Sequence, residues 1–244
     1  MDSDFSQSVE SRRCQSRRTY EHQQKTTAIM SNLYVGIGIG AGIGVSTAEK
    51  FARAGYDLVI AARKESSLQH FAKRLSRDTG RKVDCVSLDV SNLSSIEQLA
   101  DRYGAETAVV HYNAAAIHNV SLFDAAADSL ERDMTVDITG ALVTIKALTP
   151  FMERNGRGTI LLTGGGFALY PTAKFLTLSI GKAGIRNMTE ALFPMLAEKG
   201  IHLATVTVMK VVAAGTQDAA EAANAFWDLY NQPKESWTWE YKFL

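Results

Sequence analysis

Short apolar runs and amphipathic stretches alternate along the chain from residue 32 onward. Six runs rich in apolar residues lie at 33–37, 57–62, 82–88, 107–112, 159–163 and 202–208. Between them, apolar residues recur every three or four positions. Short apolar runs predict buried strands, and the longer spacing predicts helices with one buried face. Because the two kinds alternate, the pattern predicts a single α/β domain with a doubly wound parallel sheet.

Glycines mark where several of the predicted helices end. The helical patterns at 46–55, 66–80 and 91–104 each close on a glycine, which is the residue that most often terminates a helix. Longer helical patterns cover 122–152 and 175–199. Near the carboxyl end of the chain, the pattern predicts a short helix at 218–231 and an edge strand within 236–243.

The first thirty residues differ from the rest in composition. Residues 1–30 are polar and carry mixed charge, so they are predicted to be a disordered tail, with the folded domain at 31–244. The 26 basic residues balance 26 acidic ones, which predicts no nucleic-acid or membrane partner and favours a small-molecule substrate. Cys14 and Cys85 match no disulfide or metal spacing. A cytoplasmic location is expected.

The sequence "GIGIGAGIG" at 36–44 follows the first predicted strand and opens a helix. Glycines in this place let the backbone approach a pyrophosphate, whose charge the amides of the following helix attract. Two registers are possible. Gly36, Gly38 and Ala41 fit one spacing, and Gly38, Gly42 and Gly44 fit another. The alternative without a ligand is a tight turn between strand and helix.

The end of the second predicted strand indicates which dinucleotide would bind. A site for the ribose hydroxyls of NAD places an acidic residue here, about 20 residues after the glycines. Here the strand ends with Arg63 and Lys64. An arginine can pair with a 2′-phosphate, so NADP(H) is the expected cofactor. The alternative is a solvated charge at the start of a helix.

Five further segments, taken with the glycine loop, resemble the short-chain dehydrogenase/reductase family over nearly all of 32–244. They are "LDV" at 88–90, "YNAAA" at 112–116, "VDITGA" at 136–141, "GTILLTGG" at 158–165 and "GKAGI" at 181–185. The resemblance implies a Rossmann fold, NADP(H) as cofactor, and a homodimer or homotetramer formed by the two long helices. It also implies cofactor contacts at Gly38, Gly42, Ile43, Gly44, Arg63, Asp89, Val90, Asn113, Ala114, Lys182 and Val211.

The same resemblance implies an atypical catalytic centre. With the family's lysine at Lys182, the tyrosine position falls on Leu178 and the serine position on Gly165. The asparagine position is Asp137. Because neither Leu178 nor Gly165 carries a hydroxyl, only the lysine of the family's set remains.

A second tyrosine and lysine repeat the family's spacing a little earlier, at Tyr170 and Lys174. Pro171 follows the tyrosine directly and predicts a loop or first-turn backbone, so this match is interpreted as coincidental and Tyr170 as an edge-of-pocket residue. Enoyl-thioester reductases of the same family resemble a Tyr-x-x-Met-x-x-x-Lys spacing. That spacing falls on Phe175, Leu178 and Lys182, and it supplies no hydroxyl either.

Four side chains are the catalytic candidates, and no metal site is predicted. Lys182 is expected to hold the nicotinamide ribose, and Asp137 to pair with it or act as a base. His118 follows the fourth strand at the edge where such sheets bind ligands. Tyr170 is a candidate acid. For Lys182, Asp137 and His118, ordinary surface or structural roles are the alternatives.

These residues leave three functions open. The first is an atypical NADPH-dependent oxidoreductase acting on a small carbonyl or activated alkene. The second is a non-redox protein that binds NADP(H) as a sensor or scaffold. The third is a non-redox isomerase, dehydratase or cyclase that uses Asp137, His118 or Tyr170 to move protons.

Overall fold

The structure is a computed structural model that describes residues 32–244, which form one compact unit. The predicted polar tail lies outside the described residues.

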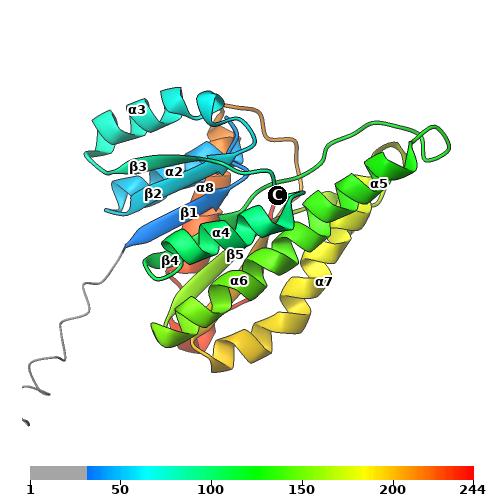
Figure 1. Ribbon diagram of the computed structural model, residues 1–244. Helices are drawn as coiled ribbons and strands as arrows, with labels where there is room; N and C mark the ends of the chain where they lie inside the picture. Colours follow the sequence, from blue (N-terminus) through cyan, green and yellow to red (C-terminus); the bar gives the residue numbers. More distant parts are fainter. Residues whose placement is uncertain (1–31) are drawn as a thin grey trace, which may run out of the picture. The chain divides into compact units, whose positions relative to one another are not determined.

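Seven parallel strands form one sheet in the order β3-β2-β1-β4-β5-β6-β7 (Figure 1). The order reverses direction next to β1, where the chain crosses from one half of the sheet to the other. This confirms the predicted doubly wound fold, with β7 as the predicted edge strand. The strands are β1 Leu33–Ile37, β2 Asp57–Ala62, β3 Val83–Ser87, β4 Thr107–Tyr112, β5 Gly158–Gly165, β6 Ile201–Val208 and β7 Glu240–Phe243.

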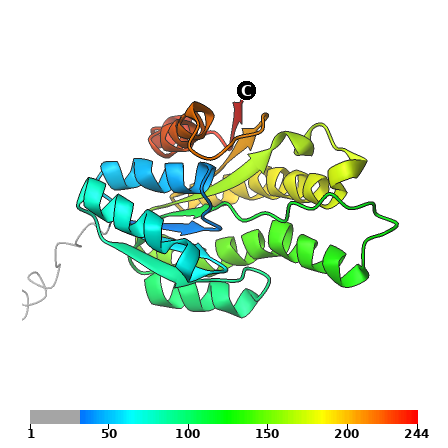
Figure 2. The ribbon, with the colours of Figure 1, turned by 90° about the horizontal axis from the view of Figure 1, so that it is seen from above.

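Helices cover both faces of the sheet. One buried cluster joins the sheet to α4, α6 and α7, and a second joins it to α2, α3 and α8. Helices α2 and α8 lie side by side on their face (Figures 1 and 2). The helices are α2 Ile43–Arg53, α3 Gln69–Thr79, α4 Leu93–Tyr103, α5 Ala127–Met134, α6 Gly140–Arg154, α7 Leu176–Glu198 and α8 Gln217–Tyr230.

The central strands are buried on both faces, which explains their nearly continuous apolar sequences. All residues of β1, β5 and β6 are buried. A parallel sheet covered by helices on both sides requires this. Polar side chains inside these strands, such as those of His111 in β4 and Thr163 in β5, are exceptions and need buried partners.

One long predicted helix differs from the observed structure. Residues 122–126 form a loop, α5 begins only at Ala127, and a π-helical turn, η2 Thr135–Thr139, separates α5 from α6. Leu122 is half exposed and Phe123 is 95% exposed. The sequence 122–126 has a helical pattern, but its apolar side chains have no surface to cover, so the pattern does not extend the helix.

Candidate functional site

The glycine loop between β1 and α2 passes very close to the turn that follows β4. Gly38 has a φ of +77°, and a β-carbon there would lie 2.4 Å from the backbone nitrogen of Ala114. Only glycine tolerates both conditions. Gly42 is the N-cap residue of α2, and Gly44 lies in its first turn. Gly36 instead lies inside β1, so the loop follows the Gly38, Gly42 and Gly44 spacing.

The amino end of α2 is suited to an anion. No acidic side chain lies in its first turn, and no side chain caps it. The first backbone amides of a helix have no partner within the helix, and the helix dipole adds positive potential there. This end of α2 therefore offers the hydrogen-bond donors that a pyrophosphate needs.

Two clefts open beside the glycine loop, at the carboxyl edge of the sheet. We call them the Lys182 cleft, with a volume of about 590 Å³, and the Arg63 cleft, with a volume of about 440 Å³. They meet at four residues that line both: Gly40, Asn113, Ala115 and Ile117.

Every residue predicted to contact the cofactor lines one of these clefts. The Arg63 cleft contains Gly38, Arg63, Asp89, Val90, Asn113 and Ala114. The Lys182 cleft contains Asn113 again, with Gly42, Ile43, Gly44, Lys182 and Val211. Segments that are far apart in the sequence thus meet around one loop.

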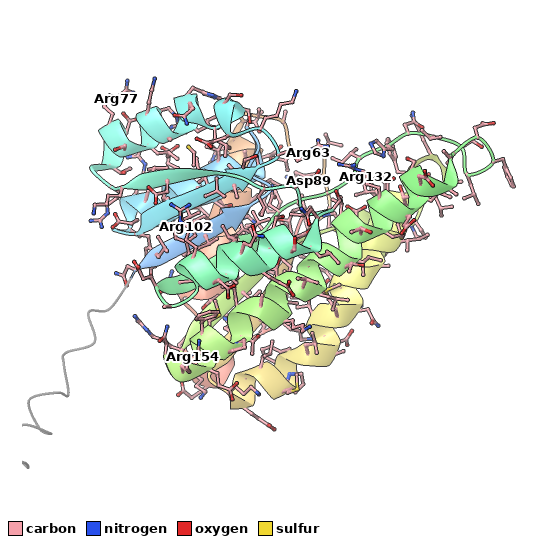
Figure 3. The ribbon with its side chains drawn as sticks, in the orientation of Figure 1. Arg63, Arg77, Asp89, Arg102, Arg132 and Arg154 are labelled. Atoms are coloured by element: carbon pink, nitrogen blue, oxygen red, sulfur yellow. The ribbon has the colours of Figure 1, made fainter. Side chains whose placement is uncertain are left out.

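Three charged side chains that line the Arg63 cleft, those of Arg63, Asp89 and Arg132, lie near one another (Figure 3). Asp89 accepts hydrogen bonds from the backbone and hydroxyl of Ser91, at 3.0 and 2.7 Å. Arg132 on α5 pairs with the same carboxylate at 2.9 Å. Partial burial raises the pKa of Asp89, but the hydrogen bonds from Ser91 and the charge of Arg132 outweigh it and hold the pKa below its ordinary value. Arg63 lines the same cleft.

Lys182 reaches the Lys182 cleft from α7. Its Nζ donates a 2.6 Å hydrogen bond to the carbonyl oxygen of Thr163, near the end of β5. Burial lowers the pKa of Lys182 to about 8. One turn before it, Leu178 is buried and lines the same cleft.

Asp137 lies in the π-helical turn, beneath the segment that follows β4. The side chain is buried, and its Oδ1 accepts a 2.7 Å hydrogen bond from the backbone of Ala116. Burial raises the pKa of Asp137 to about 6. Among the described residues it forms no ion pair with Lys182, and it lines neither cleft. The two side chains still interact, because the charge of each shifts the pKa of the other toward its ionised form, but the hydrogen bond of the carboxylate is to Ala116 and not to Lys182.

Tyr170 lies at the rim of the Lys182 cleft, as Pro171 predicts. Its side chain is 72% exposed, and its backbone nitrogen bonds to Gly166. Since α7 begins only at Leu176, Tyr170 and Lys174 do not share a helix face. Leu178 and Lys182 do share one, as the sequence predicts.

His118 belongs to the Arg63 cleft and not to the Lys182 cleft. Its exposed ring places Nδ1 2.9 Å from Oδ1 of the buried Asp133. Thr177 donates a 2.9 Å hydrogen bond to the other carboxylate oxygen of Asp133. The histidine thus lies at the ligand-binding edge of the sheet, in the cleft that does not contain Lys182.

A buried chain of polar side chains was not predicted from the sequence. Tyr34 contacts His111 at 2.8 Å, and His111 contacts Thr163 at 2.8 Å. Thr163 donates to Asn113 at 2.9 Å, and Asn113 donates to the carbonyl of Gly38 at 2.8 Å. The available signal was a histidine and a threonine at interior positions of otherwise apolar strands.

Residues 33–224 match the family model described as short chain dehydrogenase. The chain belongs to the short-chain dehydrogenase family.

Relatives in this family are distant in sequence and mostly longer. A very-long-chain 3-oxoacyl-CoA reductase of Neurospora crassa is 27% identical over 183 residues, 72% of this chain and 55% of the relative. The 11-beta-hydroxysteroid dehydrogenase A of Sesamum indicum is 32% identical over 171 residues, 67% of this chain and 48% of the relative. The chain thus spans about half the length of these curated relatives.

Solved dehydrogenase structures share the fold. A short-chain dehydrogenase from Rhodopseudomonas palustris has a TM-score of 0.77 at 25% identity, covering 87% of this chain and 98% of that one. A short-chain dehydrogenase from Sphingobium yanoikuyae, in complex with NADPH, has a TM-score of 0.73 at 23% identity, covering 81% and 84%.

Two further features of this short-chain dehydrogenase follow from residues 32–244. No cluster of three or more His, Cys, Asp or Glu side chains there could hold a metal ion. No helix within this range is long and apolar enough to cross a membrane.

Proposed function

We propose that the protein is an atypical NADPH-dependent oxidoreductase that acts on a small carbonyl compound or activated alkene. The observation that carries the proposal is the meeting of two clefts over the glycine loop, with Arg63 in one cleft and Lys182 in the other. A dinucleotide has two unlike ends joined by a pyrophosphate, and this arrangement matches that shape.

The residues present fit NADP(H). Arg63 supplies a cation for the 2′-phosphate, and no acidic side chain precedes it at the end of β2. Asp89 and Val90 line the part of the Arg63 cleft expected to hold adenine. The amino end of α2 and Gly42 receive the pyrophosphate, and Lys182 holds the nicotinamide ribose. When bound, NADPH supplies a hydride.

The Lys182 cleft favours a substrate whose carbonyl group carries apolar substituents. Phe167, Leu178, Val208 and Met209 line it, and Ile117 and Val211 extend the apolar lining to its rim. The names of the two curated relatives, a 3-oxoacyl-CoA reductase and a hydroxysteroid dehydrogenase, are those of oxidoreductases. They support an oxidoreductase on this fold.

The group that donates the proton is where this chain departs from the motif that the family resemblance implies. With Gly165 and Leu178 at the family's serine and tyrosine positions, the phenol among the residues that line the Lys182 cleft is Tyr170, at its rim. Reduction of a carbonyl needs a proton at the developing alkoxide. We assign that proton to Tyr170 or to water entering past it, while Lys182 orients the ribose.

A second function is favoured by the same two residues. A protein that binds NADP(H) without turnover, as a sensor or scaffold, has no need of a buried hydroxyl, and Gly165 and Leu178 provide none. An isomerase, dehydratase or cyclase is less favoured, because Asp137 lines neither cleft and His118 lies beside Asp133 in the Arg63 cleft.

Turnover separates these functions. NADPH oxidation would be followed by absorbance with a panel of ketones, aldehydes and enones, in the wild type and in Lys182→Met. We expect slow oxidation with apolar ketones that Lys182→Met abolishes. Saturable NADPH binding without oxidation of any compound favours the binding function. Product formation at constant NADPH absorbance identifies non-redox catalysis.

The proposal extends to the oligomeric state of the protein and to its place in the cell. We infer a homodimer or homotetramer formed through α6 and α7, in the cytoplasm. Leu142 on α6 and Ile180 and Met195 on α7 expose between 41% and 49% of their surface, as a shared apolar face requires. Light scattering at micromolar concentration should give at least twice the monomer mass of 26.6 kDa, and a monomer would contradict the inference.

A further inference from the structure

The buried side chains of β1, β4 and β5 form a hydrogen-bonded line that runs toward the glycine loop. It begins at Tyr34, passes through His111 and Thr163, and ends at Asn113, which holds the carbonyl oxygen of Gly38. Tyr34 and His111 are fully buried and Thr163 is 9% exposed. Burying this many polar groups is unfavourable unless each is satisfied.

Counting the protons available for donation shows which group donates and which accepts in every hydrogen bond of this line. The carbonyl of Gly38 can only accept, so Asn113 must present its amide nitrogen there and its oxygen to Thr163. The single hydroxyl proton of Thr163 is then used on Asn113. It follows that Thr163 accepts from His111.

The same counting fixes the tautomer of the histidine. Nε2 carries the proton that goes to Thr163, so Nδ1 is unprotonated and accepts from the hydroxyl of Tyr34. Burial lowers the pKa of His111 to about 3, which agrees with a neutral ring. Protonating it would leave Tyr34 without an acceptor.

Besides His111, Thr163 therefore contacts Asn113, which lines both clefts, and Lys182, which lines the Lys182 cleft. Its hydroxyl orients Asn113 and, through it, the glycine loop at Gly38. Its backbone carbonyl accepts the 2.6 Å hydrogen bond from Lys182.

We propose that Thr163, held by the neutral His111, is a positioning residue. It fixes the glycine loop and Lys182 in the relative position that a bound dinucleotide needs. The inference rests on the proposed function for its ligand. The line of hydrogen bonds has no exit to solvent at Tyr34, so its role is to orient groups and not to carry protons.

Substitutions at Thr163 test the inference. Thr163→Val keeps the shape and removes the hydroxyl, and Thr163→Ser keeps the hydroxyl. Thr189→Val is the matched control, because Thr189 is also buried and bonds only to Ile185 in its own helix. We expect Thr163→Val to weaken NADPH binding about tenfold, about 1.4 kcal/mol. Thr163→Ser and Thr189→Val should both bind NADPH about as tightly as the wild type.

A second readout needs no cofactor. The amides of Gly38 and Ile39 both donate to Ala61, and their hydrogen exchange reports the order of the loop. Thr163→Val should speed their exchange about tenfold, and Thr189→Val should not. If the wild type fails to bind NADPH, the proposed function fails while this measurement still tests the positioning role. Unchanged exchange in Thr163→Val would overturn that role.

A third test is made on the His111 ring of the wild type and holds even where Thr163→Val does not fold, since His111→Gln serves only to assign the signal. Nitrogen NMR of the His111 ring, assigned by its loss in His111→Gln, should show a neutral ring protonated at Nε2 from pH 5 to pH 8. A ring protonated at Nδ1, or one that titrates in this range, would overturn the inference.

Discussion

The side chain of Lys182 lies across the end of β5 at Gly165. A β-carbon on Gly165 would lie 3.3 Å from Cγ of Lys182 and 3.4 Å from Cδ. The lysine stem thus occupies part of the space beside the strand end where the family's serine is expected. A side chain at residue 165 and the course of the lysine stem are therefore coupled, so that replacing one residue affects the other.

Gly165→Ser should weaken the site instead of restoring it. The added β-carbon presses on the methylenes of Lys182, which must shift by a few tenths of an ångström. The 2.6 Å bond from Nζ to Thr163 is then strained. We expect NADPH affinity to fall about threefold to tenfold, about 0.7 to 1.4 kcal/mol, measured by fluorescence titration. An affinity equal to or above that of the wild type would show that the lysine tolerates the serine.

Leu178→Tyr should create a proton donor. Leu178 lines the Lys182 cleft one helical turn before Lys182, so a phenol there faces the same space. A positioned general acid contributes about 10²-fold to 10⁴-fold. We expect the kcat for reduction of an apolar ketone to rise at least about 10²-fold.

Leu178→Phe is the matched control for this gain, because it adds the ring without the hydroxyl. It should leave the kcat near the wild-type value. Equal rates in the tyrosine and phenylalanine variants, with NADPH bound to both, would mean that the cleft does not present the substrate to this position.

Asp137 should make stability depend on pH. Its pKa is raised from 3.8 to about 6 by burial, so the neutral form favours the folded state. This stabilisation is complete below pH 4 and is lost as the pH rises through about 6. The free energy of unfolding should therefore fall between pH 4 and pH 7 by at most about 3 kcal/mol from this group.

Urea unfolding of Asp137→Asn measures that contribution. Asparagine keeps an oxygen for the Ala116 amide but does not ionise. At pH 7 the variant should be about 1 to 3 kcal/mol more stable than the wild type, with the difference vanishing near pH 4. A difference that is constant across this range would show that the carboxyl does not titrate in it.

Two glycines of the loop should respond differently to alanine. At Gly38 the φ of +77° and the 2.4 Å approach to Ala114 leave no room for a methyl group, whereas nothing lies within 4 Å of a β-carbon at Gly40. Gly38→Ala should lower the free energy of unfolding by at least about 2 kcal/mol. Gly40→Ala should change it by less than about 0.5 kcal/mol. Similar losses in both would contradict the loop geometry.

Periodicity was sufficient to predict most of the fold. The six apolar runs became β1 to β6 because parallel strands covered on both faces need continuous apolar sequence. The edge strand near the carboxyl end is β7. The pattern failed at 122–126, where exposed Phe123 has no neighbour to cover and the helix does not form. The start of α5 at Ala127 depends on tertiary contacts, which the periodicity of the sequence does not show.

The candidate site was predictable where residues follow strand ends, and less so where side chains meet across strands. The glycine loop, Asp89 and Asn113 come together because the carboxyl ends of β1, β3 and β4 share one edge. Whether Asp137 points to Lys182 or to Ala116 depends on a π-helical turn that no spacing reveals. The partners of His111 depend on strand neighbours, which the sequence order does not give.

Calorimetric titration with NADPH and NADH measures directly whether the two clefts bind a dinucleotide and which one they prefer. The proteins are the wild type, Arg63→Ala, and Arg77→Ala as the control, since Arg77 is exposed on α3 outside both clefts (Figure 3). We expect NADPH to bind more tightly than NADH, Arg63→Ala to lose at least about tenfold in NADPH affinity, and Arg77→Ala to bind as the wild type does. Failure of the wild type to bind either nucleotide would contradict the proposed function.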